Sequence, residues 1–185
     1  MKRIIILFCL ISFTLCGCGY INPDEQYMVS AIGVEEKGAL TLYAETVSIG
    51  TDKSTAEPRV FKASGKTVED AVNNLQNGCA KSLILDHCAV IILDSNISPK
   101  TKAEVFSFCK TQKSFNISAC AVKTDNIEKL LSCTPETATV GYDIYGILKR
   151  KKISKEAKIF KSVGGRIKLY TVNRKNDTPT VKVTE

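Results

Sequence analysis

The strongest constraint on the fold is an apolar run at residues 88–93, with the sequence Cys-Ala-Val-Ile-Ile-Leu. The β-branched Val90, Ile91 and Ile92 favour an extended backbone. No polar residue interrupts the run, so neither side of the extended chain suits water. Strands of this kind lie inside sheets whose two faces are covered by helices. The run therefore predicts a central strand.

Helical patterns flank this strand. Thr67 is a suitable helix N-cap with Asp70 three residues later, and Ser98 followed by Pro99 opens another helix. The predicted elements of this region are helices at about 67–79, 98–110 and 125–132 and strands at 83–85, 88–93 and 116–123. Strand, helix and strand alternate, so we expect one α/β domain, a mixed β-sheet flanked by helices.

The chain before and after this region predicts further strands. Residues 26–34 and 39–49 are separated by Glu-Glu-Lys-Gly and predict an antiparallel hairpin. In 39–49, apolar residues alternate with Thr41, Tyr43 and Glu45, as expected where one sheet face is covered. The remaining predictions are a loop at 50–59, strands at 60–64, 167–172 and 180–183, a turn at 173–179, and a helix at 142–152 with Tyr142, Tyr145 and Leu148 on one side.

The N-terminus predicts export and lipid attachment. Lys2 and Arg3 precede an apolar run at 4–15 that is shorter than the roughly 20 residues of a membrane span. Leu15-Cys16-Gly17-Cys18 then has the bacterial lipobox pattern. The Cys18 thiol would accept diacylglycerol, and small residues before it suit the signal peptidase. Cys16 is a poorer candidate for the lipidated cysteine, because the bulky Leu15 directly precedes it. The alternative is a plain signal peptide in which the cysteine is coincidental.

Cleavage before Cys18 divides the chain into three parts. Residues 1–17 form a lipoprotein signal peptide, 18–25 a lipidated tether and 26–185 the α/β domain. Of eight cysteines, two leave with the signal and Cys18 takes the lipid. The others are Cys79, Cys88, Cys109, Cys120 and Cys133. Their spacing matches no metal site, so we favour buried thiols over disulfides.

Two motifs invite a chemical interpretation. Gly65-Lys66-Thr67 lies between a strand and a helix, where a phosphate loop would lie, but Val60 occupies the position that needs glycine. We interpret the motif as a turn and an N-cap, without nucleotide. His87 is the single histidine, and consecutive strand residues diverge, so His87 and Cys88 would not cooperate. A structural histidine with a backbone hydrogen bond is favoured. We therefore predict no enzyme, no metal and no cofactor.

A basic run is the strongest charge feature of the chain, whose formal net charge is +7. It comprises Lys149, Arg150, Lys151 and Lys152 and is continued by Lys155, Lys158 and Lys161. On a lipid-anchored protein these residues would contact anionic headgroups or a protein partner. A solvated helix face is the equally weighted alternative. Export from the cytoplasm argues against nucleic acid.

Taken in order, several short motifs resemble one family, the C-subunit lipoproteins of bacterial spore germinant receptors, the Ger(x)C type. The resemblance extends over roughly residues 20–132. It is carried by the lipobox with Glu25 after it, Val29-Ser30-Ala31-Ile32-Gly33-Val34, Ala63-Ser64-Gly65-Lys66-Thr67 with Glu69-Asp70-Ala71 and Leu75, His87 before Val90-Ile91-Ile92, and Ala121-Val122-Lys123 before Leu130-Leu131. Family members usually have Trp where Tyr20 stands and are about twice as long, so we expect the N-terminal domain only.

The resemblance implies a non-enzymatic subunit held by the diacylglycerol on Cys18 at the outer face of the spore's inner membrane. Its implied partners are the A and B receptor subunits, and its implied role is nutrient-triggered germination. A small solute-binding lipoprotein of an uptake system is the alternative. Such proteins normally have two lobes with a cleft between them, which is more than this length suggests.

Overall fold

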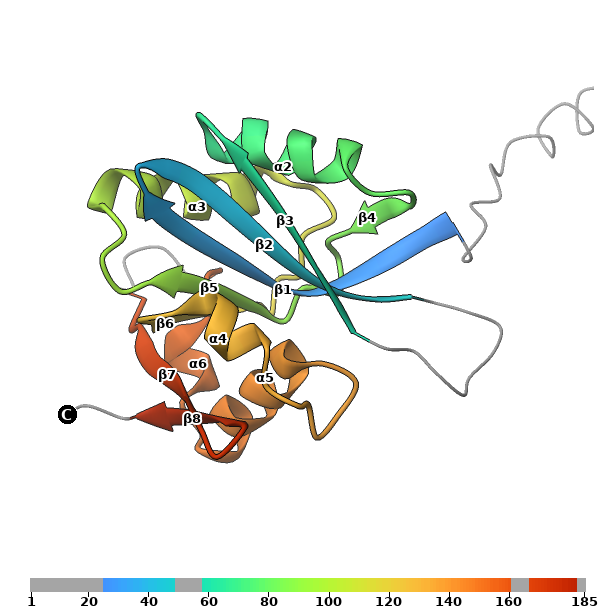
Figure 1. Ribbon diagram of the computed structural model, residues 1–185. Helices are drawn as coiled ribbons and strands as arrows, with labels where there is room; N and C mark the ends of the chain where they lie inside the picture. Colours follow the sequence, from blue (N-terminus) through green and yellow to red (C-terminus); the bar gives the residue numbers. More distant parts are fainter. Residues whose placement is uncertain (1–24, 49–57, 161–166, 183–185) are drawn as a thin grey trace, which may run out of the picture.

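A computed structural model describes residues 25–48, 58–160 and 167–182, and these form one α/β domain with an eight-stranded mixed sheet. The predicted fold class is confirmed (Figure 1). The strands are β1 (Gln26–Lys37), β2 (Ala39–Ser48), β3 (Arg59–Gly65), β4 (Ser82–Ile84), β5 (Val90–Asp94), β6 (Cys120–Thr124), β7 (Tyr170–Lys175) and β8 (Thr178–Lys182). The helices are α2 (Val68–Asn77), α3 (Pro99–Thr111), α4 (Ile127–Leu131), α5 (Val140–Arg150) and α6 (Ser154–Ala157). The signal peptide, Cys18 and most of the predicted 50–59 loop lie outside the described residues.

The sheet has the order β3-β2-β1-β5-β6-β7-β8, and β4 pairs with β1. Strands β1, β5, β6 and β7 run parallel, whereas both ends of the sheet are antiparallel hairpins. All five residues of β5 are buried, so the predicted central strand is confirmed, although it begins two residues later than expected. Val90 pairs with Ala31 on one side and with Cys120 on the other.

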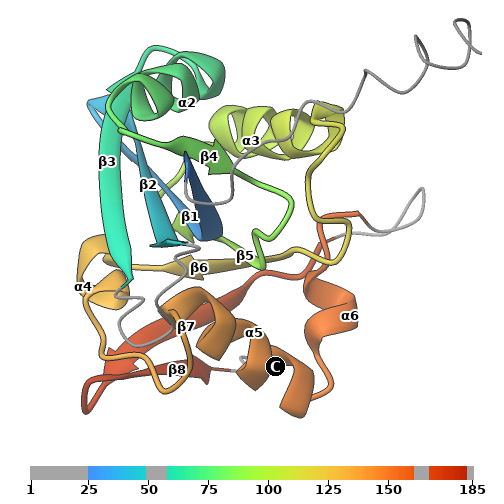
Figure 2. The ribbon, with the colours of Figure 1, turned by 90° about the vertical axis from the view of Figure 1, so that its right-hand side faces the viewer.

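Two layers of helices cover the sheet. Helices α2 and α3 lie on one face and α4, α5 and α6 on the other (Figures 1 and 2). Leu42, Ile91 and Val105 belong to the core beneath α2 and α3, whereas Tyr43, Ile92 and Ile144 belong to the second core. The expectation that only one face of residues 39–49 is covered is therefore wrong.

The β1–β2 hairpin turns more tightly than predicted. Strand β1 continues through Lys37, which pairs with Ala39, so the predicted four-residue turn contracts to Gly38. Gly38 has a φ of +77°, which glycine adopts without steric cost. A β-bulge at Ser30 interrupts the same pair of strands, because Val29 opposes Thr46 while Ala31 opposes Glu45.

The C-terminal third departs most from the sequence predictions. Helix α5 begins at Val140, two residues earlier than predicted, and buries Val140, Ile144 and Leu148. Tyr142 and Tyr145 are half-buried and pack against the same core as Leu148. The predicted turn at 173–179 is largely strand. Asn176 and Asp177 form its two-residue loop with φ of 49° and 63°, the type I′ geometry that suits the twist of a hairpin.

Other boundaries shift by a few residues. Strand β6 begins at Cys120 rather than 116, because residues 116–119 form a turn in which the Ala119 N–H donates to the Asn116 carbonyl over 3.0 Å. Helix α2 ends at Asn77 with Gly78 as its C-cap, so Cys79 lies beyond the helical face on which the sequence places it. Helix α6 has no counterpart among the predictions.

Carboxylates from distant elements cap three of the helices. The Val68 N–H of α2 donates to Glu104 of α3 over 2.8 Å. The Ser98 N–H, before α3, donates to Glu36 of β1 over 2.9 Å. The first N–H of α5 donates to Glu45 of β2 over 2.7 Å. Each carboxylate satisfies a donor that a helix leaves free and meets the positive end of the helix dipole. Thr67 and Ser98 also cap α2 and α3 as predicted.

Candidate functional site

The most deeply buried carboxylate among the described residues is that of Glu45 in β2, which is 1% exposed. Its Oε1 accepts from the Val140 N–H over 2.7 Å, and its Oε2 accepts from the Gly141 N–H over 2.8 Å. The Ser30 hydroxyl, at the bulge, donates to the same Oε2 over 2.9 Å. Both carboxylate oxygens are therefore occupied, and Glu45 fastens the start of α5 to the β1–β2 hairpin.

The environment of Glu45 sets its acidity. Burial raises the pKa of Glu45, while the Gly141 N–H, the Ser30 hydroxyl and the Val140 N–H act to lower it; the negative charge of Asp143 adds to the rise. The group has no path to a substrate, because the sheet and α5 enclose it. The Glu45 carboxylate therefore has a structural role, which is to hold the start of α5 on the hairpin. The sequence offered one signal for it, an acidic residue alternating with apolar ones in a strand.

A second carboxylate organises the loop before α5. Asp143 Oδ2 accepts from the Glu136 N–H over 2.7 Å, and its Oδ1 accepts from the Thr137 N–H over 2.9 Å and from the Thr137 hydroxyl over 2.6 Å. Thr139 caps the helix, since its hydroxyl oxygen accepts from the Tyr142 N–H. These hydrogen bonds hold the loop against the first turn of α5, and they occupy both carboxylate oxygens of Asp143.

The structure does not support the predicted structural histidine. The side chain of His87 is 52% exposed, and its Nε2 lies 3.6 Å from the carboxylate of Asp86, which is itself 49% exposed. Cys88 is fully buried, and burial raises the pKa of its thiol far above the usual range. The expected buried hydrogen bond of the His87 ring is wrong, because residues 86 and 87 precede β5 in an exposed turn. Asp86, His87 and Cys88 therefore share no site.

The Gly65-Lys66-Thr67 motif is a tight junction between β3 and α2. A Cβ on Gly65 would lie 2.3 Å from the backbone nitrogen of Ala71. The missing side chain thus lets α2 fold back onto β3. Thr67 accepts from the Asp70 N–H over 3.1 Å, as an N-cap does. The close approach of α2 is a sufficient reason for a glycine at position 65, so no bound phosphate is needed to account for it.

The five cysteines in the described parts of the chain are free thiols. Cys88, Cys109, Cys120 and Cys133 are buried, so the predicted burial is confirmed for these four, whereas Cys79 is half-buried. Burial raises the pKa of Cys109 to about 12 and that of Cys120 to about 11. These two thiols are protonated at neutral pH and make poor nucleophiles. Within the described ranges, no three His, Cys, Asp or Glu side chains are grouped so that they could hold a metal ion.

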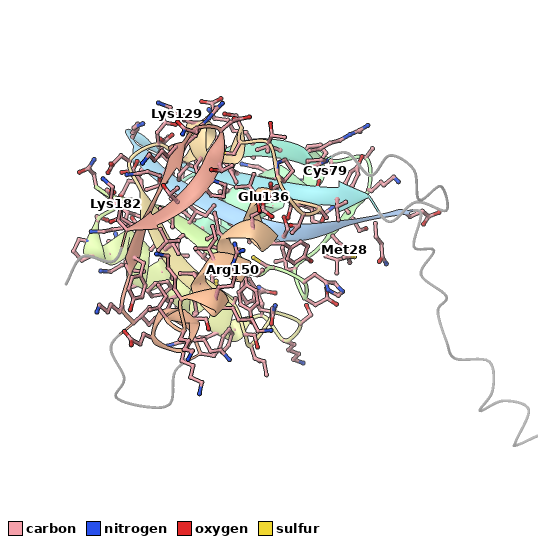
Figure 3. The ribbon with its side chains drawn as sticks, turned by 90° about the horizontal axis from the view of Figure 1, so that it is seen from below. Met28, Cys79, Lys129, Glu136, Arg150 and Lys182 are labelled. Carbon is pink, nitrogen blue, oxygen red and sulfur yellow. The ribbon has the colours of Figure 1, made fainter. Side chains whose placement is uncertain are left out.

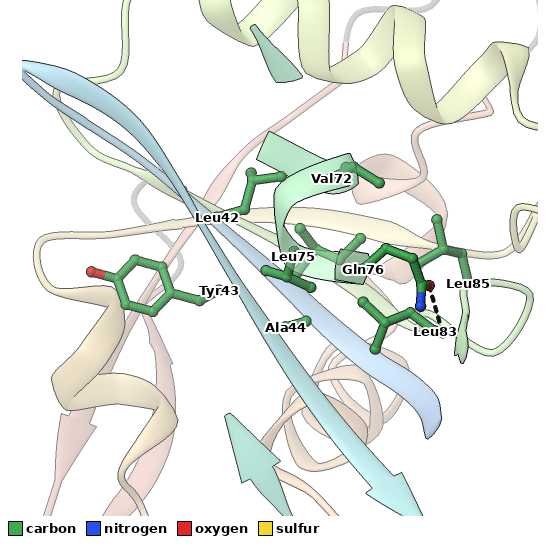
Figure 4. Close-up of a pocket in the computed structure, with 9 residues that line it drawn as sticks. Leu42, Tyr43, Ala44, Val72, Leu75, Gln76, Leu83 and Leu85 are labelled. Atoms are coloured by element: carbon green, nitrogen blue, oxygen red, sulfur yellow. Dashed lines mark hydrogen bonds between the residues drawn. The ribbon is translucent and has the colours of Figure 1, made fainter. Parts of the chain in front are cut away.

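The hollows of the domain are small or open. An apolar cavity of about 50 Å³ lies between α2 and the sheet; Gln76 closes one side by accepting from the Leu83 N–H over 2.8 Å (Figure 4). A wider hollow of about 280 Å³ lies between α5 and the start of β8. Arg150 and Glu136, both on the face seen in Figure 3, line it together with Pro179.

The predicted basic run ends α5. Lys149, Arg150, Lys151 and Lys152 are all exposed, and Lys155 is exposed on α6, whereas Lys161 lies outside the described residues. The helix ends in a Schellman motif: the Lys152 N–H donates to the Lys149 carbonyl and the Ile153 N–H donates to the Leu148 carbonyl. This geometry turns the chain sharply, so the four residues do not share one direction, and Arg150 belongs to the hollow beside β8.

Lys152 occupies the left-handed position of this motif, with a φ of 59°. Lys152→Gly should raise the free energy of unfolding by about 0.5–1 kcal/mol, because glycine adopts this conformation without a Cβ clash. Urea unfolding followed by circular dichroism measures it. Lys151→Gly is the matched control: its φ of −75° is helical, so this change should destabilise the protein. Equal effects of the two changes on stability would contradict the assignment of Lys152 to the left-handed position of the motif.

Comparison with known proteins identifies a family. The family described as spore germination protein N-terminal domain matches residues 19–162. This match covers more than three quarters of the chain and nearly every described element, including Glu45 and the start of α5. No curated protein and no solved structure matches the chain significantly. Among the described residues, no helix is long and apolar enough to cross a bilayer.

Proposed function

Because the chain belongs to the family of the spore germination protein N-terminal domain, we propose that it is a lipid-anchored, non-enzymatic subunit of a spore germinant receptor. The family match over residues 19–162 carries the proposal. In this role the protein helps to convert nutrient detection into germination through contacts with the membrane-embedded A and B receptor subunits. Neither nucleotide nor nucleic acid takes part.

The chemistry of the domain supports a role in contacts rather than catalysis. Three carboxylates are buried among the described residues, those of Glu45, Asp94 and Asp143. Both oxygens of Glu45 and of Asp143 accept hydrogen bonds from backbone N–H groups and hydroxyls of the protein itself, and one oxygen of Asp94 accepts from the Asn96 N–H. His87 and its acidic neighbour are exposed and separate from the buried thiols. A solute-binding lipoprotein would need a cleft between two lobes, whereas the described residues form a single sheet. The structure thus favours the receptor subunit.

The proposed anchor is a diacylglycerol on Cys18, which would hold the protein at the outer face of the spore's inner membrane. Residues 1–17 would be the signal peptide, residues 18–25 the tether, and residues 26–185 the domain. Only seven residues separate Cys18 from β1, which begins at Gln26. A fully extended chain spans at most about 3.6 Å per residue, so the domain would stay within about 30 Å of the bilayer.

We expect Cys18→Ala to abolish incorporation of a radiolabelled fatty acid and to leave an uncleaved precursor, because the transferase requires this thiol. Cys16→Ala is the matched control, since it alters the same motif and should keep the label. Label that persists in Cys18→Ala would refute the anchor. The receptor role is tested separately: spores that lack the protein should lose the response to at least one nutrient germinant, and unchanged responses to all of them would refute it.

A further inference from the structure

The turn before β6 presents an isolated aliphatic side chain to solvent. Ile117 is 73% exposed, more than any other large apolar residue in the described parts of the chain. The turn that carries it is ordered: the Ala119 N–H donates to the Asn116 carbonyl, and the Ser118 N–H donates to the Asn116 side chain over 2.9 Å. The fold therefore holds Ile117 outward at the tip of a hydrogen-bonded turn.

This turn is joined to the segment that follows α5. The Ile159 N–H donates to the Ala119 carbonyl over 3.0 Å, and the Cys120 thiol lies 3.5 Å from the Ser154 carbonyl oxygen. Beneath the turn, the rings of Phe115 and Phe160 lie 6.2 Å apart. In Figure 2 the yellow chain that enters β6 and the orange helix α6 lie on the same side of the molecule. The turn that carries Ile117 and the segment of residues 154–159 are thus neighbours.

The two neighbouring segments, and the end of α5 that leads into the second of them, carry lysines. We call this surface the basic turn face; it consists of Lys113, Ile117, Lys151, Lys152, Lys155 and Lys158. One carboxylate lies among these lysines, that of Glu156. It accepts from the Tyr170 hydroxyl over 2.6 Å and lies 3.8 Å from the Lys168 ammonium, so its charge is partly balanced. The face is predominantly cationic.

We propose that the basic turn face rests on the anionic headgroups of the bilayer and that Ile117 inserts between them. The inference rests on the proposed lipid anchor, which keeps the domain close to the membrane. Near an anionic surface each lysine strengthens binding about fivefold. Lysine stems lie along the acyl boundary while their ammonium groups reach the phosphates. A lone aliphatic residue on a convex turn enters such a boundary at little cost.

The shape of the face favours a bilayer over a protein partner. Protein interfaces concentrate their binding energy in clustered aromatic and arginine side chains that fill pockets. The basic turn face offers one aliphatic side chain and five lysines, without an arginine or an exposed ring. Ammonium groups on flexible stems match a fluid array of phosphates and do not require a fixed geometry. The arrangement thus suits many equivalent headgroups better than one shaped site.

The test uses the lipidated protein reconstituted on vesicles. One set contains phosphatidylglycerol and phosphatidylcholine, the other phosphatidylcholine alone. Lysines are labelled with a water-soluble amine reagent and quantified by mass spectrometry. On anionic vesicles, labelling of Lys151, Lys152, Lys155 and Lys158 should slow by about fivefold or more relative to Lys66, which lies on the α2 side. On neutral vesicles, and on anionic vesicles in 1 M salt, the difference should disappear.

The variant Ile117→Asn should fold normally, because the side chain is exposed, and should reduce the protection on anionic vesicles. Val60→Asn is the matched control at the other large apolar residue that is exposed in the described parts of the chain, and it should leave the protection unchanged. Even labelling of all lysines on floated vesicles overturns the proposal, as does equal protection on neutral vesicles, which would indicate a contact without charge recognition. Failure of the protein to float with vesicles instead refutes the lipid anchor, so the two failures are distinguishable.

Discussion

Glu45→Ala should lower the free energy of unfolding by about 3–5 kcal/mol, because it leaves three buried donors without an acceptor. The Val140 N–H, the Gly141 N–H and the Ser30 hydroxyl all lose their partner, and the truncated side chain leaves a cavity beneath α5. Urea unfolding followed by circular dichroism measures the change. The exposed Glu69 in the first turn of α2 is the control, and Glu69→Ala should cost less than about 0.5 kcal/mol.

The same group gives the stability a defined pH dependence. Burial raises the pKa of Glu45 above its ordinary value of 4.5, so the folded protein holds this proton more tightly than the unfolded chain does. Its contribution is fully present below pH 4.5 and declines as the pH rises through the folded-state pKa. Subtracting the curve of Glu45→Gln, which does not titrate, isolates this trend from other carboxylates. A difference that grows with pH would contradict the assignment.

Gly65→Ala should destabilise the domain by about 3 kcal/mol. A Cβ at this position would lie 2.3 Å from the Ala71 nitrogen and 2.8 Å from the Ala71 Cα, both of them backbone atoms that cannot rotate away. The β3–α2 junction would have to open, and α2 would lose packing against the sheet. The measurement is the midpoint and slope of urea unfolding.

Gly146→Ala is the matched control for this prediction. Gly146 lies inside α5, and nothing within 4 Å would meet its added Cβ. The same chemical change should therefore raise the free energy of unfolding by about 0.5–1 kcal/mol through helix propensity. If the two substitutions change the free energy of unfolding equally, the close contact between position 65 and the Ala71 backbone is not the reason for a glycine there.

The sequence predicted the elements whose signals are local. The apolar run gave β5, Thr67 and Ser98 marked the starts of α2 and α3, and Gly38 marked the first hairpin turn. Each signal lies within a few residues of the structure it predicts. The α/β class followed because several such signals agreed in one order along the chain.

The elements that the sequence missed depend on distant partners. The alternating pattern suggested that Glu45 faces solvent. Its carboxylate oxygens instead accept hydrogen bonds from backbone amides about a hundred residues later in the chain, and no residue near Glu45 in the sequence indicates this contact. The β7–β8 turn was predicted too long, because Asn176 and Asp177 adopt positive φ without the glycine that usually marks such a two-residue loop. His87 was predicted to be a structural, hydrogen-bonded residue because it adjoins the apolar run, but the strand starts only at Val90 and leaves the ring exposed.

The carboxylate caps couple helix formation to tertiary assembly, because the caps of α3 and α5 come from strands of the sheet and the cap of α2 comes from α3. Residues 68 and 104, 98 and 36, and 140 and 45 are separated by 36, 62 and 95 positions. Helices of 10 to 13 residues are marginal in isolation, so α2, α3 and α5 depend on these remote acceptors to complete their first turns. We therefore expect α5 to become stable only once the β1–β2 hairpin has closed and placed Glu45 against its first turn. We expect the long loops that these caps close to limit the folding rate, and we expect the amides of Val140 and Gly141 to be protected from exchange with solvent as long as α5 stays docked on the hairpin.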